Sequence, residues 1–317
     1  MSFKWNVHYT GSKGNSVSIY TNQFNILVDA GKPYKFIEPL LYEKHFLIFT
    51  HRHGDHFKPA VYKKIRENFP NIKILANEEV SNLMFEKTKI PADVVFSDNF
   101  QFQIGTMKFT TIQNYHGAGE ELVDCHGLII EDIESGEVLL YATDLSTTID
   151  YQEYLDKNSL QVDYFLLESN YDPQVIEFYE STKAHTGFDI FSNGSYRHLA
   201  STEHKEFTEK YCKPDSIVVP LHQSETYSTF EGLIKRTKKD ENKITMEDVE
   251  AWKKKQEQMS YKMLLILDYG YTVNDLLNTL EERTDLIKMG FTFNEIFKAK
   301  WLRLKAEDER NGIWNRN

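Results

Sequence analysis

Short apolar runs separated by turn residues constrain the fold of this chain more than any other feature. Up to about residue 222 these runs are rich in Val, Ile, Leu and aromatic residues, which is typical of buried strands. Helical patterns fall between some of them, at 59–68, 78–87 and 198–211, so the sequence predicts a mixed α/β domain with helices covering sheets. The residues at 134–137 predict a hairpin turn. The predicted strands are 17–20, 25–31, 45–50, 73–76, 107–113, 126–131, 137–144, 163–169 and 216–221.

The pattern changes after about residue 235 to charged, Leu-rich sequence with helical periodicity. Within it GYTVNDL (270–276) recurs as GFTFNEI (290–296), and each copy is typical of a helix stop at Gly followed by a capping box. These two helix corners are either turns between the helices of a small bundle or an element that binds DNA, and both interpretations stay open. We expect a catalytic domain at 1–235 and a helical domain at 236–317.

The charge and cysteine content exclude several classes of protein. Residues 236–317 hold 16 Lys and Arg against 15 Asp and Glu, so residues 1–235 carry the excess behind the net charge of −11. The excess of negative charge argues against a long nucleic-acid footprint on this domain and is compatible with a short one. The two cysteines, Cys125 and Cys212, form no disulfide framework. No apolar stretch approaches the roughly 20 residues that span a bilayer, so we expect a cytoplasmic protein with no membrane partner.

The segment THRHGDH (50–56) places three histidines and an aspartate directly after an apolar run. In an extended chain His51 and His53 point to the same side, whereas the neighbours Asp55 and His56 diverge. One short loop can therefore serve two neighbouring metal positions. Gly54 is expected to let the backbone turn sharply between these donors.

Further donors follow other predicted strands. His116, Asp144 and His222 each stand at or just after the end of an apolar run. A single polar residue at a strand end is usually a hydrogen-bonded loop residue, but together with the loop these three complete two sites of three or four donors. His126, the rival of His116, begins a predicted strand instead of ending one.

These residues resemble, in order, the five motifs of the metallo-β-lactamase superfamily, over about residues 3–230. The resemblance implies an αββα sandwich with a dinuclear site at one edge, to which this chain adds a C-terminal helical extension. Zinc is the usual metal of the family and manganese is the alternative. The resemblance implies one ion on His51, His53 and His116, the other on Asp55, His56 and His222, with Asp144 bridging and Asp29 of VDAG (28–31) in support.

Three further stretches bear on the branch of this superfamily. GSKGNS (11–16) resembles the N-terminal signature of the exonuclease-like branch known as YycJ or WalJ, although a Gly/Ser turn explains it equally well. LLESNYD (166–172) and RHLAS (197–201) resemble the Glu and His motifs that this branch shares with ribonuclease Z. Arg197 stands where the family has Gly, which leaves the substrate open.

The resemblance implies a metal-dependent hydrolase, namely a dinuclear phosphodiesterase that cleaves a P–O bond of DNA or RNA by a metal-bridged hydroxide. Asp55 would orient the nucleophile, and His198, oriented by Glu168, would stabilise the phosphate or protonate the leaving oxygen. A cyclic-nucleotide phosphodiesterase, a glyoxalase II-type thioester hydrolase and a non-catalytic metal-bearing interaction protein stay open as alternatives. The helical tail is a candidate surface for homodimerisation or a protein partner.

Overall fold

The computed structural model describes residues 2–116, 123–182, 197–238 and 242–256. The chain divides into two units, 1–242 and 243–317. Only 243–256 of the second unit is described, and it is helical over 246–256. The expected domain boundary at residue 235 falls inside α8 (Phe230–Thr237), and both copies of the repeated helix corner lie outside the described residues, so this division of the chain stays a prediction.

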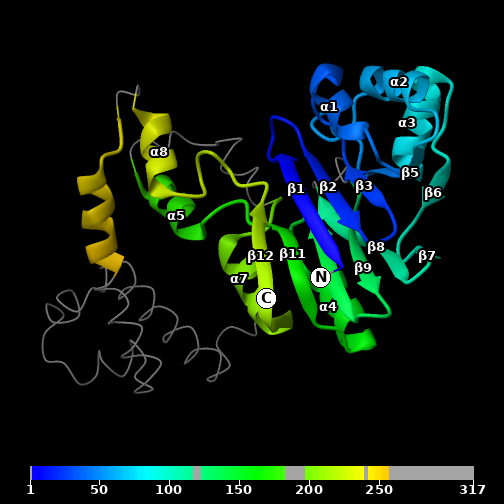
Figure 1. The fold of residues 1–317 in the computed structure, drawn as a ribbon. Coiled ribbons are helices and arrows are strands. Elements are labelled where there is room, and N and C mark those ends of the chain that lie inside the picture. The colour runs from blue at the N-terminus through cyan, green and yellow to red at the C-terminus, as the bar shows by residue number, and fades with distance from the viewer. Residues whose placement is uncertain (1, 117–122, 183–196, 239–241, 257–317) are drawn as a thin grey trace, which may run out of the picture. The chain divides into compact units, whose positions relative to one another are not determined.

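Two six-stranded sheets form the first unit (Figure 1). One sheet contains, in spatial order, β1 (Phe3–Tyr9), β2 (Ser16–Thr21), β3 (Asn25–Val28), β4 (Phe46–Phe49), β5 (Lys73–Asn77) and β6 (Val94–Phe96). The other contains β12 (Cys212–Leu221), β11 (Val162–Glu168), β10 (Glu137–Ala142), β9 (Val123–Asp132), β8 (Met107–His116) and β7 (Gln101–Ile104).

Each sheet is antiparallel on one side and parallel on the other. Pairing is parallel from β3 through β6 and from β10 through β12. Parallel neighbours need long crossover connections, and helices supply them here. Among the described residues, the helices of the first unit are α1 (Tyr34–Leu41), α2 (Pro59–Asn68), α3 (Glu78–Thr88), α4 (Ile149–Asn158), α5 (Pro173–Ser181), α7 (Ser201–Tyr211) and α8.

Three apolar clusters define the layers. The central cluster joins residues of both sheets, such as Ile19 with Phe109 and Leu139, and therefore lies between them. A second cluster packs the outer face of the first sheet against α1, α2 and α3, and a third packs the second sheet against α4 and α7. The layers run helix, sheet, sheet, helix, which confirms the expected sandwich.

Several elements differ from the sequence prediction. The strands β1, β6 and β7 and the helices α1, α4, α5 and α8 were not among the predicted elements, and α1 contains Pro39 within its eight residues. The helix predicted at 198–211 begins only at Ser201, because His198 lies in the preceding turn with its side chain directed to Glu168. The hairpin at 134–137 is confirmed by the antiparallel pairing of β9 with β10. In the part of the chain that the structure describes, no helix is both long and apolar enough to cross a bilayer.

Candidate metal centre

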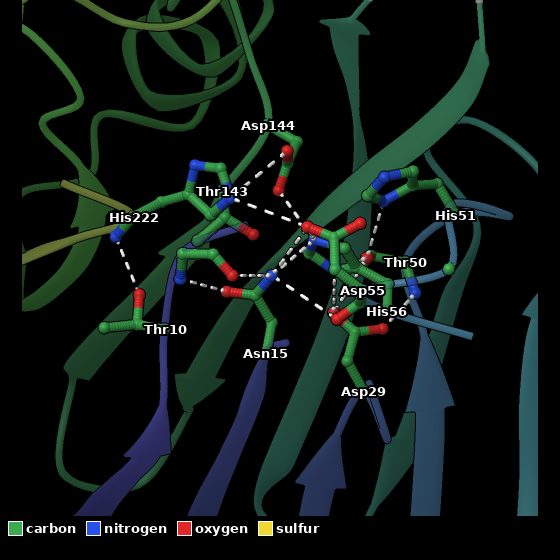
Figure 2. Close-up of polar contacts among 12 residues, drawn as sticks. Thr10, Asn15, Asp29, Thr50, His51, Asp55, His56, Thr143, Asp144 and His222 are labelled. Atoms are coloured by element: carbon green, nitrogen blue, oxygen red, sulfur yellow. Dashed lines mark hydrogen bonds and ion pairs between the residues drawn. The ribbon is translucent and has the colours of Figure 1, made fainter. Parts of the chain in front are cut away.

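The predicted donors meet at one edge of the sandwich, where several strands end. Asp29 follows β3, the loop at 50–56 follows β4, and Asp144 and His222 follow β10 and β12 closely. Figure 2 shows the labelled side chains of these loops converging from both sheets. His116 and Glu168 are the last residues of β8 and β11 and complete this edge.

Three of these residues have left-handed backbone conformations. The φ angles are 62° at Asp29, 61° at Asp144 and 52° at His222. Each such non-glycine conformation costs on the order of 1–3 kcal/mol and persists only where surrounding contacts hold it. The three residues all come just after a strand, so the strained turns direct their side chains into the same edge of the sandwich.

Among the described residues, five overlapping groups of three donors have their ligand atoms within 4.8 Å of one another, and two of these groups match the sites that the resemblance implies. His51, His53 and His116 offer one set of atoms within 4.8 Å of one another, and Asp55, His56 and His222 offer another. The carboxylate of Asp144 lies beside both groups, with Oδ2 at 3.0 Å from His56 Nε2 and Oδ1 at 3.6 Å from His222 Nε2 and 3.7 Å from His116 Nε2. The structure thus brings together every predicted ligand, whereas their division between two ions stays a prediction, since three further overlapping groups of donors include Asp144 or His198.

The chemistry of this donor set fits divalent metal ions. His51 and His56 are completely buried and Asp144 is 3% exposed. Among the described residues, His51 Nε2 and His222 Nε2 find no hydrogen-bond partner. A buried polar atom without a partner costs roughly 1–3 kcal/mol, and imidazole nitrogens together with carboxylate oxygens are ligands that zinc accepts.

Asp29 fixes the orientation of His56. Its carboxylate accepts hydrogen bonds from Thr50 N and Thr50 Oγ1, both at 2.9 Å, and lies 2.7 Å from His56 Nδ1. This contact turns His56 Nε2 toward Asp144, as a supporting carboxylate does for a metal-binding histidine. Burial lowers the pKa of His56, but the carboxylates of Asp144 and Asp29 outweigh it and raise this pKa to about 10. The centre is therefore strongly attractive to cations.

Glu168 orients two further histidines. Its buried Oε1 lies 2.7 Å from His198 Nδ1 and 2.9 Å from His222 Nδ1, and Leu145 N donates to its Oε2 at 2.9 Å. Burial raises the pKa of Glu168, but His198 and His222 outweigh this effect and lower it to about 2, so the group is ionised at neutral pH. His198 keeps 18% of its side chain exposed and lies beside Asp144, 4.0 Å away.

Asn15 belongs to this centre and was not predicted as a site residue. Its buried Nδ2 lies 2.7 Å from His56 Nε2 and 3.4 Å from Asp55 Oδ2. Figure 2 shows Asn15 beside these two residues. Its backbone N donates to Asp55 O at 2.7 Å. The GSKGNS turn therefore contacts the loop at 50–56, which we name the metal loop, and the resemblance of that turn to a family signature was the signal that pointed to the turn.

Two other polar residues support the ligands. Thr50 Oγ1 lies 3.1 Å from His51 Nδ1, and Asn170 Nδ2 donates to His222 O at 2.6 Å. Both residues lie inside stretches that the sequence singled out, at 50–56 and 166–172, but neither residue type indicates a role by itself. His126 stays outside the described ligand groups and lies instead between Asp98 (2.8 Å) and Asp124 (3.4 Å).

The loop turns at Gly54 as predicted, with His56 N donating to His53 O at 2.9 Å, but the position that requires glycine is Gly31. Gly54 has no left-handed φ, and a Cβ there would meet nothing within 4 Å. A Cβ on Gly31 would lie 1.6 Å from Asp55 O. The VDAG segment thus passes directly against the metal loop, and only a residue without a side chain fits there.

Comparison with known proteins gives a structural match without a sequence match. No family model and no curated protein matches the sequence. The crystal structure of the metallo-β-lactamase fold protein YhfI from Bacillus subtilis superposes with a TM-score of 0.51 at 16% identity, over 74% of this chain and 90% of that chain.

Two further solved structures match less well. Human tRNase Z, short form, has a TM-score of 0.48 at 14% identity, over 69% of this chain and 92% of that chain. A diphosphatase from the PhnP family has a TM-score of 0.49 at 16% identity, over 73% and 90%. The two helix-covered sheets and the superposition on YhfI show that this chain has the metallo-β-lactamase fold.

Proposed function

We propose that this chain is a metal-dependent hydrolase that cleaves phosphodiester bonds of a nucleic acid. The observation that carries the proposal is the pair of Glu168 and His198 beside the two ligand groups, with 2.7 Å between Oε1 and Nδ1. Glu168 engages Nδ1, which leaves Nε2 of His198 to face a substrate. A histidine held in this way can stabilise a phosphate oxygen or give a proton to the leaving oxygen.

The ligand groups explain why divalent ions are needed before an anionic substrate can enter. Asp29, Asp55, Asp144 and Glu168 concentrate four carboxyl groups at one edge of the sandwich, and a phosphodiester would be repelled by them. When bound, two divalent ions neutralise this charge and lower the pKa of water, so that a nucleophile is available near neutral pH. An imidazole-rich donor set suits zinc, and manganese is the second candidate.

Asp55 is suited to orient the nucleophile. Burial raises its pKa, but the nearby imidazole of His222 and the charge of His56 outweigh burial and lower that pKa. A carboxylate that is ionised and 25% exposed can accept a hydrogen bond from an attacking water. The residues proposed to hold the metal ions are His51, His53, Asp55, His56, His116, Asp144 and His222, with Asp29 in support.

Hydrolysis of bis(p-nitrophenyl) phosphate by the purified protein with zinc or manganese tests this proposal. We expect turnover by the wild type, none by His53→Ala, and unchanged turnover by His45→Ala, which removes an exposed histidine outside the centre. Full activity of His53→Ala would contradict the site. Turnover of S-lactoylglutathione without any phosphodiester hydrolysis would instead favour a thioester hydrolase.

A cyclic nucleotide is the second candidate substrate, and the acidic charge of residues 1–235 favours it. A small ligand needs no extended basic track, whereas a nuclease that contacts several phosphates loses affinity steeply with salt. Measuring KM for a cyclic nucleotide and for short DNA and RNA strands between about 50 and 200 mM salt separates the two. A salt-independent KM with preference for the cyclic nucleotide would overturn the nuclease proposal.

A further inference from the structure

Two aromatic rings and two lysines cluster where the end of β1 meets the start of α1. Tyr9 and Phe36 are in edge-to-face contact with 6.4 Å between ring centroids. Lys32 Nζ lies 5.1 Å from the centre of the Tyr9 ring, and Lys35 Nζ lies 4.8 Å from the centre of the Phe36 ring. We name these four residues the aromatic platform.

The platform lies next to the metal loop. Tyr9 pairs with Ser16 across the β1–β2 ladder, one residue from Asn15, whose side chain contacts His56. Lys32 directly follows Gly31, whose N donates to Asn15 O at 3.0 Å. On the other side, the residue after Tyr9 is Thr10, whose Oγ1 accepts a hydrogen bond from His222 N at 2.7 Å. Figure 2 shows Thr10 and Asn15 on the β1–β2 side of the centre.

The side chains of the platform are available to a ligand. Phe36 is 43% exposed, and the core-facing residues of α1 are Ile37 and Leu41 instead. Among the described residues, neither Lys32 nor Lys35 has a carboxylate within 4 Å. By contrast, Lys13 of the nearby GSKGNS turn is paired with Glu225.

Charge and ring chemistry together identify the ligand class. In a chain with a net charge of −11, two lysines that carry no ion pair beside a metal centre are complementary to a polyanion. An exposed aromatic ring flanked by lysines is the arrangement on which single-stranded nucleic acids stack their bases while the lysines contact the phosphates. In a duplex the faces of the bases are already covered by their neighbours, so a stacking platform favours single strands.

We infer that the aromatic platform binds the nucleotides that flank the scissile phosphate of a single-stranded nucleic acid. This inference rests on the proposed function and names its substrate. Phe36 stacks on a base, Tyr9 supports the Phe36 ring edge-on, and Lys32 and Lys35 contact two phosphates of the strand. A strand offers two phosphates to the two lysines and a base to the ring, whereas a cyclic nucleotide offers a single phosphate.

Fluorescence anisotropy with labelled oligodeoxyadenylate and its RNA counterpart tests the inference. Every protein is the full chain carrying His198→Ala, which slows cleavage and leaves every proposed metal ligand in place. We expect Phe36→Ala to weaken binding about 10-fold or more and Phe36→Trp to restore it, since one stacked base contributes that much to affinity. Lys32→Gln combined with Lys35→Gln should lower the slope of log K against log salt by about 1.4, which is the effect of two single-strand phosphate contacts.

A matched control exists on α3. Phe85 is 53% exposed and Lys89 Nζ lies 5.6 Å from the centre of its ring, so the same two side-chain types meet there away from the centre. Phe85→Ala should leave binding unchanged. Phe36→Ala and Phe36→Trp should unfold at the same midpoint as the parent protein. The loss of binding would then come from the missing ring and not from unfolding of the protein.

The outcomes separate the two proposals. The platform would be overturned if the single strand did not bind, or if Phe36→Ala did not weaken its binding. It would also be overturned if a duplex of the same length bound as tightly as the single strand. Each of these results would count even if small phosphodiesters are hydrolysed. Binding that depends on Phe36, together with no hydrolysis of bis(p-nitrophenyl) phosphate, would keep the platform and overturn the enzyme. If Phe36→Ala weakened only the binding of cyclic AMP, the inferred substrate would be wrong.

Discussion

Replacing Gly31 by alanine should disable the metal centre without any change to a ligand. The new Cβ would lie 1.6 Å from Asp55 O, 2.3 Å from Asp55 C and 2.8 Å from Asn15 N. Since an ordinary contact needs about 3.5 Å, the metal loop would have to move by nearly 2 Å. The movement would also break the hydrogen bond of 2.7 Å between Asn15 N and Asp55 O.

The size of the effect follows from this displacement. A misplacement of about 1 Å in a reacting group can lower the rate about 100-fold, so we expect at least that loss in kcat/KM for bis(p-nitrophenyl) phosphate. Overpacking of this kind lowers the free energy of unfolding by about 1–3 kcal/mol, which a urea titration measures. The metal content of Gly31→Ala, determined by elemental analysis, should fall as well.

Gly54→Ala is the control for Gly31→Ala, because Gly54 lies in the metal loop itself and its Cβ would meet nothing within 4 Å. We expect Gly54→Ala to keep its metal content and its turnover. If Gly31→Ala retained wild-type activity and metal content, the contact between VDAG and the metal loop would not hold the centre together, and our account of it would be wrong.

Other substitutions test separate parts of the structure. Asp29→Asn should weaken metal binding about 10- to 100-fold in a calorimetric titration, because the carboxylate that orients His56 is lost; unchanged affinity would contradict that role. His198→Ala should lower kcat about 100- to 10,000-fold while metal content stays at the wild-type level, and a matching loss of metal would identify His198 as a ligand. Phe109→Ala should cost about 3–5 kcal/mol of unfolding free energy, since this buried ring stacks on Phe102 at 4.5 Å in the central core; a cost below that of the exposed Phe85→Ala would refute this packing.

The sequence was sufficient for a mixed α/β domain and, through the family resemblance, for the sandwich and the place of each candidate ligand. Apolar runs mark buried strands whatever their partners, and donors such as Asp144 and His222 stand immediately after such runs. The structure brings these donors to one edge because β3 to β6 and β10 to β12 pair in parallel, so that consecutive strand ends meet. Whether they hold metal ions stays a proposal.

Other features depend on tertiary contacts that no local pattern encodes. Asn15 became visible as a site residue only when its side chain was placed 2.7 Å from His56, because Asn is also an ordinary turn residue. The helix α1 escaped prediction because Pro39 lies inside it, and it is held by burial of Ile37 and Leu41. The requirement for glycine at position 31 has the same origin, because the contact between Gly31 and Asp55 joins segments far apart in the sequence.

The measurement that tests the central claim most directly is the number of metal ions bound per chain, by elemental analysis of the protein purified with zinc or manganese. Two ligand groups around Asp144 predict about two ions per chain in the wild type and a loss in His53→Ala. A wild-type protein that binds no divalent ion under either metal would contradict the claim that these buried histidines and aspartates form a metal centre.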